Sequence, residues 1–424
     1  MASESLVAPW KTVKFQKGLE SNHCQNTCNH RVLARLEKDD EELILHAMRD
    51  DISRYEDDKG EGTWEYYKKC VNPYEFVFTQ KRYNTFPDSV CMLRPLSRSY
   101  FKMIEMLSIS HFFEDMQQKF SISGSNSVRV GKLYSGHVCE GPGGFIEGFI
   151  DGCSGRRMCP ERCSTMTLYS TNTNVPGWRR ASNFIRHNRC VQITYGDDGT
   201  GDILKPENQT AFIRECNPKV HLFTGDGGFD FSTDYDSQEV SVFPLLVATT
   251  RVGLESLDIG GFFIIKLFDF YNPATIDLIY FISIHFESWT LYKPAMSRPC
   301  NSEQYLIGCR FKGCHSFTSD VMKSWYANIQ TTNTLVRIYS DPLPSEFMKY
   351  LLGVRTASFN SQIRYLSTVF DIIENGTSDD IVKILKHHEF QSYDWCKRFN
   401  VPVCRRRAQI IEGSRTDLQD AGRR

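Results

Sequence analysis

The stretch from Lys132 to Phe149 constrains the fold of this chain more than any other part of the sequence. A mostly apolar run, Leu133 to Cys139, stops abruptly at a Gly-Pro-Gly-Gly turn at 141–144, and an amphipathic run follows it. This order predicts a strand, a tight turn and a helix, which form the first crossover of a doubly wound α/β sheet. Glycines in such a turn let the backbone approach a ligand closely, and the helix start offers unpaired N–H groups. A plain glycine-rich turn that binds nothing is the simpler alternative.

The glycine spacing is not that of a dinucleotide-binding fingerprint, and no Lys-Ser or Lys-Thr pair follows for a phosphate loop. A ligand at this turn therefore need not carry a polyphosphate. The net charge of -1 over 424 residues does not by itself indicate nucleic-acid binding, so any basic surface must be a local patch. No apolar run approaches the roughly 20 residues of a membrane span.

The 15 cysteines are scattered and odd in number, and the N-terminus lacks a signal-peptide pattern, so we expect reduced thiols. The segment Gly152 to Cys163 carries three cysteines and three arginines without a fourth ligand nearby, and we interpret it as a loop with free thiols. Four residues near the N-terminus are of types that bind zinc, but their spacing is unusual, so we interpret them as free thiols and surface histidines. They are His23, Cys24, Cys28 and His30.

Alternating strand and helix patterns continue along the chain, with glycines at several strand ends. After the first strand, the expected strands are 166–169, 190–195, 220–223, 261–267, 289–292 and 305–311. The expected helices are 97–107, 240–257, 273–286, 363–373 and 378–387. This order specifies an α/β sheet, and the last two strands predict an antiparallel hairpin at one edge.

Two flanking stretches have the composition of RNA-contacting surfaces. Trp64 to Thr85 interleaves aromatic rings with lysines and an arginine, which suits stacking on bases and pairing with phosphates. Taken alone, a small aromatic core with a charged face explains it better. The run Cys404 to Arg407 begins a polar tail, which we interpret as a solvated, mobile terminus rather than a phosphate contact.

Charged side chains at the strand ends predict a reactive site. Asp226 follows a buried strand among glycines, and Lys266 lies in an otherwise apolar strand, where a lysine is costly unless it is used. Lys102 from an earlier helix and Glu303 from a late loop would complete a set of two lysines and two carboxylates. A second cation and partial burial would lower the pKa of an amine, which could then accept a hydroxyl proton without a metal. The pattern alone does not establish that the four side chains converge.

Acidic residues also follow the strand at 190–195, where a switch-point crevice could use them to bind a hydroxyl or amino group. They are Asp197, Asp198 and Asp202. An acidic surface turn explains this spacing equally well.

Five blocks of sequence occur in the order found in FtsJ-like, S-adenosylmethionine-dependent ribose 2′-O-methyltransferases. They are CEGPGGF at 139–145, YGDDGTGDILKPEN at 195–208, GDGGFDF at 225–231, IIKLFD at 264–269 and SRPCNSEQY at 297–305. They most resemble the cap-methylating, Adrift-type branch, over about Pro87 to Lys312. The resemblance implies a Rossmann-like methyltransferase sheet with helices on both faces and an antiparallel edge hairpin. We place this domain at 87–324, an N-terminal extension that could form an RNA-approach surface at 1–86, and a mostly helical extension with a basic tail at 325–424.

The resemblance also implies residue roles. By motif, a Lys-Asp-Lys-Glu tetrad would be Lys102, Asp226, Lys266 and Glu303, of which Lys102 is matched by position only. The S-adenosylmethionine site would comprise Cys139, Glu140, Gly141, Pro142, Gly143, Gly144, Phe145, Asp202 and Ile203. Substrate contacts are assigned to Lys69, Asn72, Asn301 and Ser302. No metal is implied. Glu140 departs from the small residue that cellular relatives often carry in this turn.

The implied activity is ribose 2′-O-methylation of RNA, with capped mRNA as the partner and no membrane involved. The same chemistry on another RNA is one alternative. A degenerate fold that serves as an RNA-binding or virion structural module is another. The length and divergent flanks point to a viral member of the family, which implies action in the cytoplasm of an infected cell and packaging in the virion.

Overall fold

The computed structural model describes residues 14–18, 40–55, 63–79, 83–120, 130–172, 175, 177–228, 238–332 and 335–421. The chain divides into two compact units, which are described separately. The first unit contains Ser99–Pro294 and Glu303–Arg355, together with the strand near residue 16. The second contains Lys38–Arg98, Ala295–Ser302 and Thr356–Arg424.

The first unit is built on one eight-stranded sheet with the strand order β1-β7-β8-β6-β5-β2-β3-β4. Its parallel strands are β2 (Gly131–Val138), β3 (Met158–Met166), β4 (Val191–Thr194), β5 (Val220–Gly225) and β6 (Leu257–Leu267). Antiparallel pairing adds β8 (Gln304–Phe311), β7 (Phe286–Tyr292) and β1 (Gln16–Lys17). The predicted α/β sheet and its antiparallel hairpin near one edge are therefore confirmed. The chain reverses its strand order at β2, which is where doubly wound sheets bind ligands.

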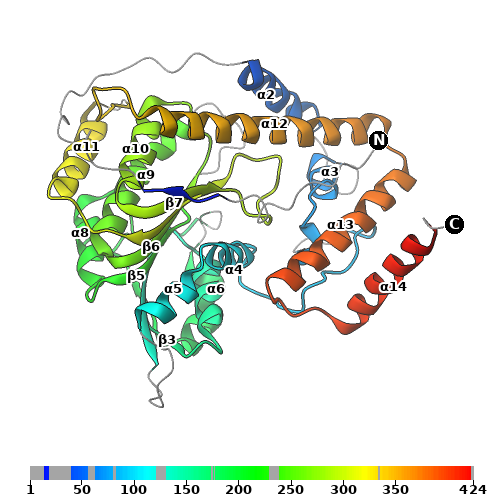
Figure 1. Cartoon of the computed structure of the whole chain (residues 1–424), viewed down its shortest axis with the longest axis horizontal. Coiled ribbons are helices and arrows are strands. Elements are labelled where there is room, and N and C mark those ends of the chain that lie inside the picture. Colours follow the sequence, from blue (N-terminus) through cyan, green and yellow to red (C-terminus); the bar gives the residue numbers. More distant parts are fainter. Residues whose placement is uncertain are drawn as a thin grey trace. The chain divides into compact units, whose positions relative to one another are not determined.

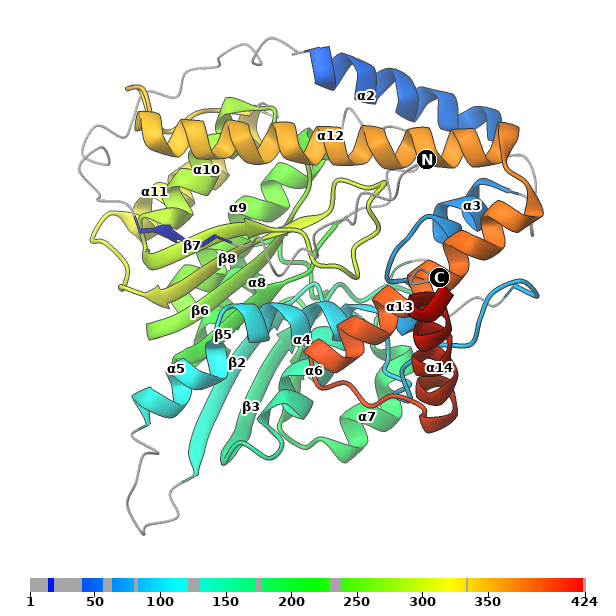
Figure 2. The same ribbon diagram turned by 45° about the vertical axis from the view of Figure 1, so that its right-hand side comes forward.

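Helices cover both faces of this sheet (Figures 1 and 2). One group is α4 (Ser99–Ile109), α5 (Phe112–Lys119) and α6 (Gly144–Cys153). The other group is α8 (Pro206–Glu215), α9 (Gln238–Ser256), α10 (Pro273–Ser283) and α11 (Thr318–Thr332). The short helices η4 (Trp178–Ala181) and α7 (Ser182–His187) lie between β3 and β4 in the chain. Buried aromatic rings such as Phe223 and Phe263, stacked 5.6 Å apart, fill the core of the sheet.

The second unit joins helices from both ends of the chain. They are α2 (Asp40–Asp51), η2 (Ile52–Tyr55), α3 (Trp64–Cys70), η3 (Glu75–Val77), α13 (Ser378–Arg398), α14 (Arg405–Ala421) and the later part of α12 (Ser345–Asn375). Arg49 donates to Gln362 at 2.7 Å, and Tyr55 donates to Glu374 at 2.7 Å. A capping box in which the Thr377 hydroxyl accepts from the Asp380 amide begins α13.

The aromatic rings of Trp64 to Thr85 pack within this second unit. Tyr66 is buried and stacks on Phe86 at 5.3 Å, and Tyr83 meets Phe86 edge-on at 4.8 Å. The simpler interpretation of this stretch, a small aromatic core, is therefore the observed one. Its role as an RNA-approach surface stays a prediction.

Two local features differ from the expectations. The segment Gly152 to Cys163 is not a loop, because β3 begins at Met158 and ends at Met166, where the next strand was predicted to start. Exposed Cys159 alternates with partly buried neighbours in the outer half of β3, which hid the strand. The tail after Cys404 contains the helix Arg405–Ala421, which the sequence pattern did not predict, while its mobility stays a prediction.

The division predicted from sequence, with boundaries at 86 and 324, does not coincide with the two units. Residues 38–98 and 356–424 share the second unit with a short insertion between β7 and β8, whereas the rest of both predicted extensions belongs to the first unit. Whether the segments 1–86, 87–324 and 325–424 fold as separate domains stays a prediction. The residues weighed as zinc ligands or as free thiols and surface histidines, at positions 23, 24, 28 and 30, lie outside the described residues. None of the described helices is long and apolar enough to cross a bilayer.

Candidate active site

The turn between β2 and α6 contains a glycine in a left-handed backbone conformation, which a residue without Cβ adopts most readily. Gly143 has φ of 102° at the N-cap of α6, and its amide donates to the Glu140 carbonyl at 2.5 Å. Cys139, the residue after β2, is also left-handed at φ of 58°. This backbone path exposes the first N–H groups of α6 at the carboxyl edge of the sheet. The predicted strand, glycine turn and helix are confirmed.

The four predicted catalytic side chains lie in one hydrogen-bonded cluster of the first unit. Lys102 Nζ donates to Glu303 Oε1 at 2.5 Å, and Lys266 Nζ lies 3.3 Å from Asp226 Oδ1. Their side chains are 12–18% exposed, so each is largely shielded but still reachable from solvent. They come from α4, the end of β5, the end of β6 and the residue before β8. The structure thus brings the four together, while their catalytic role stays a prediction.

Tyr305 on β8 joins the two pairs into one network. Its hydroxyl donates to Asp226 Oδ1 at 2.8 Å, and Lys102 Nζ donates to it at 3.4 Å. Burial raises the pKa of Tyr305, and the negative charges of Asp226 and Glu303 raise it further, so the phenol stays protonated. Tyr305 was not predicted to have a role, although it ends the block SRPCNSEQY, two residues after Glu303.

The protonation state of Lys266 differs from the expectation. Burial alone would lower the pKa of its amine, but the Asp226 and Glu303 carboxylates more than offset this and raise the pKa above the ordinary lysine value. The predicted lowered pKa is therefore wrong for the protein without ligand. The nearest charges to Lys266 are anions, whereas the expectation gave most weight to a second cation.

A carboxylate is buried in the glycine turn itself. Glu140 is 4% exposed, its Oε1 accepts from the Thr224 hydroxyl, and His137 Nδ1 lies 2.7 Å from the same hydroxyl. Burial raises the pKa of Glu140, and its Oε2 has no hydrogen-bond partner among the described residues. Such an atom is costly unless a ligand completes it, and a ligand with an ammonium group fits this acceptor.

A second turn follows β4 at the same edge. Gly201 has φ of 65°, and a Cβ there would lie 2.1 Å from the Thr167 carbonyl oxygen, so the turn packs directly against the end of β3. Asp202 accepts from the Leu204 amide at 2.9 Å, and Asn208 Nδ2 donates to the Asp202 carbonyl at 3.0 Å. Ile203 is 3% exposed. Asp202 therefore stands on a rigid turn, where it could bind a hydroxyl or amino group.

The other acidic residues of this turn have structural partners. Asp197 forms an exposed pair with Arg214 at 2.8 Å. Asp198 accepts from Thr200 and Asn208, and its hydrogen bond with Lys205 holds its pKa well below the usual range. These two carboxylates organise the turn.

The predicted substrate residues all belong to the second unit. Lys69 is 5% exposed, with its Nζ 5.0 Å from the centre of the Tyr83 ring, and Asn72 is completely buried and donates to Glu75 at 2.6 Å. Ser302 is 5% exposed, and Asn301 is exposed. Direct RNA contact therefore fits Asn301 best. All four assignments stay predictions.

Comparison with known proteins identifies the family. The model of the family described as FtsJ-like methyltransferase matches residues 95–311, which is half of the chain. The chain belongs to this family.

Curated relatives of this FtsJ-like chain are cap-specific mRNA (nucleoside-2'-O-)-methyltransferases 1. The Xenopus laevis protein is 29% identical over 299 residues, covering 65% of this chain and 34% of the relative. The Homo sapiens protein is 30% identical over 263 residues, covering 58% of this chain and 30% of the relative. The chain therefore spans about a third of the length of the relatives it matches.

Among solved structures, human Methyltransferase-like protein 13 in complex with S-adenosylhomocysteine matches with a TM-score of 0.31 and 10% identity. That match covers 64% of this chain and 93% of the other chain, and its TM-score is too low to carry an argument. The described part of this FtsJ-like chain contains no group of three or more His, Cys, Asp or Glu residues arranged to hold a metal ion.

Proposed function

We propose that this chain transfers a methyl group from S-adenosylmethionine to a ribose 2′-oxygen of RNA, next to the 5′ cap. The observation that carries the proposal is the convergence of Lys102, Asp226, Lys266 and Glu303 at the carboxyl edge of an FtsJ-like sheet. The similarity to cap-specific mRNA (nucleoside-2'-O-)-methyltransferases supports the cap-proximal position.

The residues at this edge fit the proposed cofactor. The turn at 140–145 would hold its methionine and ribose part, with the unpaired Glu140 Oε2 as an acceptor for the amino group. Asp202 and Ile203 would contact its adenosine end. When bound, S-adenosylmethionine supplies a sulfonium methyl group, which is already a good electrophile, so alignment provides much of the acceleration.

The tetrad would hold and deprotonate the ribose hydroxyl. Asp226, 3.3 Å from Lys266 Nζ, fixes the direction of the amine, and the pair formed by Lys102 and Glu303 completes the network through Tyr305. Attack by the 2′-oxygen would form the new O–C bond while the bond between the methyl carbon and sulfur breaks and S-adenosylhomocysteine leaves, and the hydroxyl proton would pass to Lys266 Nζ in molecules whose amine is neutral. Because the carboxylates raise the pKa of Lys266, this neutral fraction is small at pH 7 and grows with pH.

The test is a methyl-transfer assay on one RNA made with and without a 5′ cap. The chain should methylate the capped RNA at the 2′-oxygen of the first transcribed nucleotide. Equal activity on both RNAs would replace the cap-proximal proposal with an internal or ribosomal target. No transfer by a folded protein to any RNA would remove the catalytic proposal.

A catalytically inactive RNA-binding module is the second candidate. The observation that favours it is Glu140, which places a buried carboxylate inside the turn that would hold the cofactor. Calorimetric titration with S-adenosylhomocysteine separates the two proposals, because only the enzyme needs micromolar binding.

We also propose a viral source. The length and divergent flanks resemble the FtsJ-like protein of African swine fever virus, and this resemblance supports action in the infected-cell cytoplasm and packaging in the particle. Detection of the protein in cytoplasmic fractions and in purified particles tests this. Its confinement to nuclei would contradict it.

A further inference from the structure

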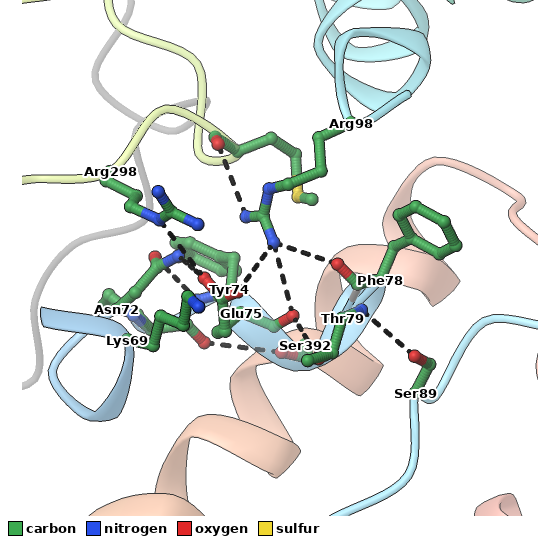
Figure 3. A network of polar contacts seen from close by, with 12 residues as sticks. Lys69, Asn72, Tyr74, Glu75, Phe78, Thr79, Ser89, Arg98, Arg298 and Ser392 are labelled. Atoms are coloured by element: carbon green, nitrogen blue, oxygen red, sulfur yellow. Dashed lines mark hydrogen bonds and ion pairs between the residues drawn. The ribbon is translucent and has the colours of Figure 1, made fainter. Parts of the chain in front are cut away.

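The second unit contains a buried carboxylate that gathers cationic groups from two separate segments. Glu75 on η3 is 1% exposed. Its Oε1 lies 3.2 Å from Arg98 Nη1, its Oε2 lies 3.6 Å from Arg298 Nε, and Asn72 Nδ2 donates to Oε2 at 2.6 Å (Figure 3). We call Glu75, Asn72, Arg98 and Arg298 the Glu75 cluster.

One of these segments is the insertion between β7 and β8. Arg298 and Met296 both belong to this insertion, and Arg98 Nη2 donates to the Met296 carbonyl at 3.5 Å. The Asn301 amide donates to the Arg298 carbonyl at 3.2 Å, so Arg298 and Asn301 share one turn. The Glu75 cluster therefore connects the turn that carries Asn301, a predicted substrate residue, to η3 within the second unit.

The part of the Glu75 cluster on and around η3 is held by several further hydrogen bonds. Arg98 Nη1 also donates to the Phe78 carbonyl at 2.9 Å, and the Thr79 hydroxyl donates to the Glu75 carbonyl at 2.9 Å. The Asn72 side-chain oxygen accepts from the Tyr74 amide at 3.3 Å. With so many contacts fixing η3, displacement of Glu75 would be costly, and the insertion is the segment that yields when the anchor is lost.

We propose that Glu75 is a positioning residue for the RNA substrate: its carboxylate holds Arg298 so that the turn ending at Asn301 and Ser302 is ordered before RNA arrives. This inference rests on the proposed function. An ordered loop avoids part of the entropic cost of binding, so loss of the anchor weakens RNA binding and raises KM. Cofactor affinity should not change, because the cofactor residues belong to the first unit.

The alternative is that Arg298, whose side chain is 30% exposed, contacts an RNA phosphate directly. The two explanations predict opposite changes in the RNA affinity of the Glu75→Gln variant. Glu75→Gln removes a negative charge and keeps both arginines, so a phosphate contact would keep its strength or gain some. Loss of the anchor predicts weaker binding in the same variant.

The experiment compares Glu75→Gln and Arg298→Gln with Arg407→Gln in the full chain. Arg407 pairs with Glu389 in the same unit, with side chains 19% and 14% exposed, so Arg407→Gln controls for general loosening of that unit. Circular dichroism checks folding, and calorimetry gives the Kd for S-adenosylhomocysteine. Fluorescence anisotropy gives the Kd for a short capped RNA over a range of salt concentrations.

The expected result is about tenfold weaker RNA binding for Glu75→Gln and for Arg298→Gln, from a displaced contact. Arg407→Gln should bind RNA as the wild type does, and all variants should keep their affinity for S-adenosylhomocysteine. The salt dependence for Arg298→Gln should match the wild type, whereas loss of one phosphate contact would reduce its slope by about 0.7.

Unchanged or tighter RNA binding by Glu75→Gln would overturn the inference while leaving the proposed function intact. Equal weakening by Arg407→Gln would overturn it as well. If Glu75→Gln fails to fold, the RNA affinity and salt slope of Arg298→Gln decide between the two explanations. Wild-type protein that binds S-adenosylhomocysteine but no capped RNA would overturn the proposed substrate and this inference together.

Discussion

The tetrad formed by Lys102, Asp226, Lys266 and Glu303 and the Glu75 cluster both set cations against carboxylates, but they differ in the type and exposure of their charged groups. In the tetrad the cations are the lysines Lys102 and Lys266, and their side chains are partly open to solvent. In the Glu75 cluster the cations are arginines and the central carboxylate side chain is only 2% exposed. Lysine can lose its proton and move on a flexible stem, whereas arginine keeps its charge and binds carboxylates with a rigid fork. The first arrangement suits chemistry and the second suits anchoring.

The largest expected effect is on the rate of methyl transfer, and it should follow from a change in the tetrad and not from one in the Glu75 cluster. Lys266→Ala should reduce methyl transfer by roughly 10³-fold, because it removes the group that we propose holds and deprotonates the ribose hydroxyl. Single-turnover assays with saturating capped RNA measure this loss. The thermal transition should shift little, since removing Lys266 also relieves its burial. A variant that retains activity would remove Lys266 from the mechanism.

The opposite pattern is expected for the Glu75 cluster. Glu75→Ala removes the acceptor of the Asn72 hydrogen bond and the ion-pair partner of Arg98 and Arg298, and should lower the free energy of unfolding by about 2–3 kcal/mol. This is below the usual cost of breaking a fully buried pair, because Arg298 is partly exposed and can be rehydrated. Urea unfolding followed by tryptophan fluorescence gives the value. A change below 0.5 kcal/mol, about the scale of an ordinary surface substitution, would show that the cluster is not an anchor.

The pH dependence of catalysis sharpens the comparison within the tetrad. In the wild type the Lys266 pKa is raised, so kcat should increase with pH from neutral into the alkaline range. Asp226→Asn removes a carboxylate that raises this pKa, so the rise should occur at lower pH although the maximal rate is smaller. Rate profiles under single-turnover conditions test the direction. A shift toward higher pH would mean that Lys266 is not the group that titrates.

The smallest effect is expected at Tyr305. Its phenol links Lys102 to Asp226 but donates only one hydrogen bond, at 2.8 Å. Tyr305→Phe should lower kcat by about tenfold, the equivalent of roughly 1.4 kcal/mol, through loss of that bond. The ring contact with Phe145 remains, so S-adenosylhomocysteine affinity should stay within twofold. A loss as large as that of Lys266→Ala would mean that Tyr305 takes part in proton transfer.

The sequence predicted the sheet well where strands are buried on both faces. The strands around Phe223 and Lys266 are apolar runs bounded by glycines, and both were placed correctly. The strand predicted at 166–169 overlaps β3 only at Met166, because Cys159 and Arg162 leave the outer half of β3 without an apolar run. The helix after Cys404 was missed because its charged composition resembles a solvated tail.

The candidate site was predictable in its members but not in its charge state. Lys266 and Asp226 stood out because charged groups at buried strand ends are costly, whereas Tyr305 looked like ordinary core. The raised pKa of Lys266 depends on which charges lie nearest, and only coordinates reveal that. Glu75 was not assigned a role, because an acidic residue in an aromatic stretch looks like part of a solvated face.

The most direct test of the central claim is the position of the methyl group in the RNA product. Capped RNA would be incubated with S-adenosylmethionine and either the wild type or Lys266→Ala, digested to nucleosides and cap dinucleotides, and analysed by mass spectrometry. The account predicts a 2′-O-methylated first transcribed nucleotide with the wild type and none with Lys266→Ala. A methyl group on a base, or the same 2′-O-methylation from both proteins, would contradict it.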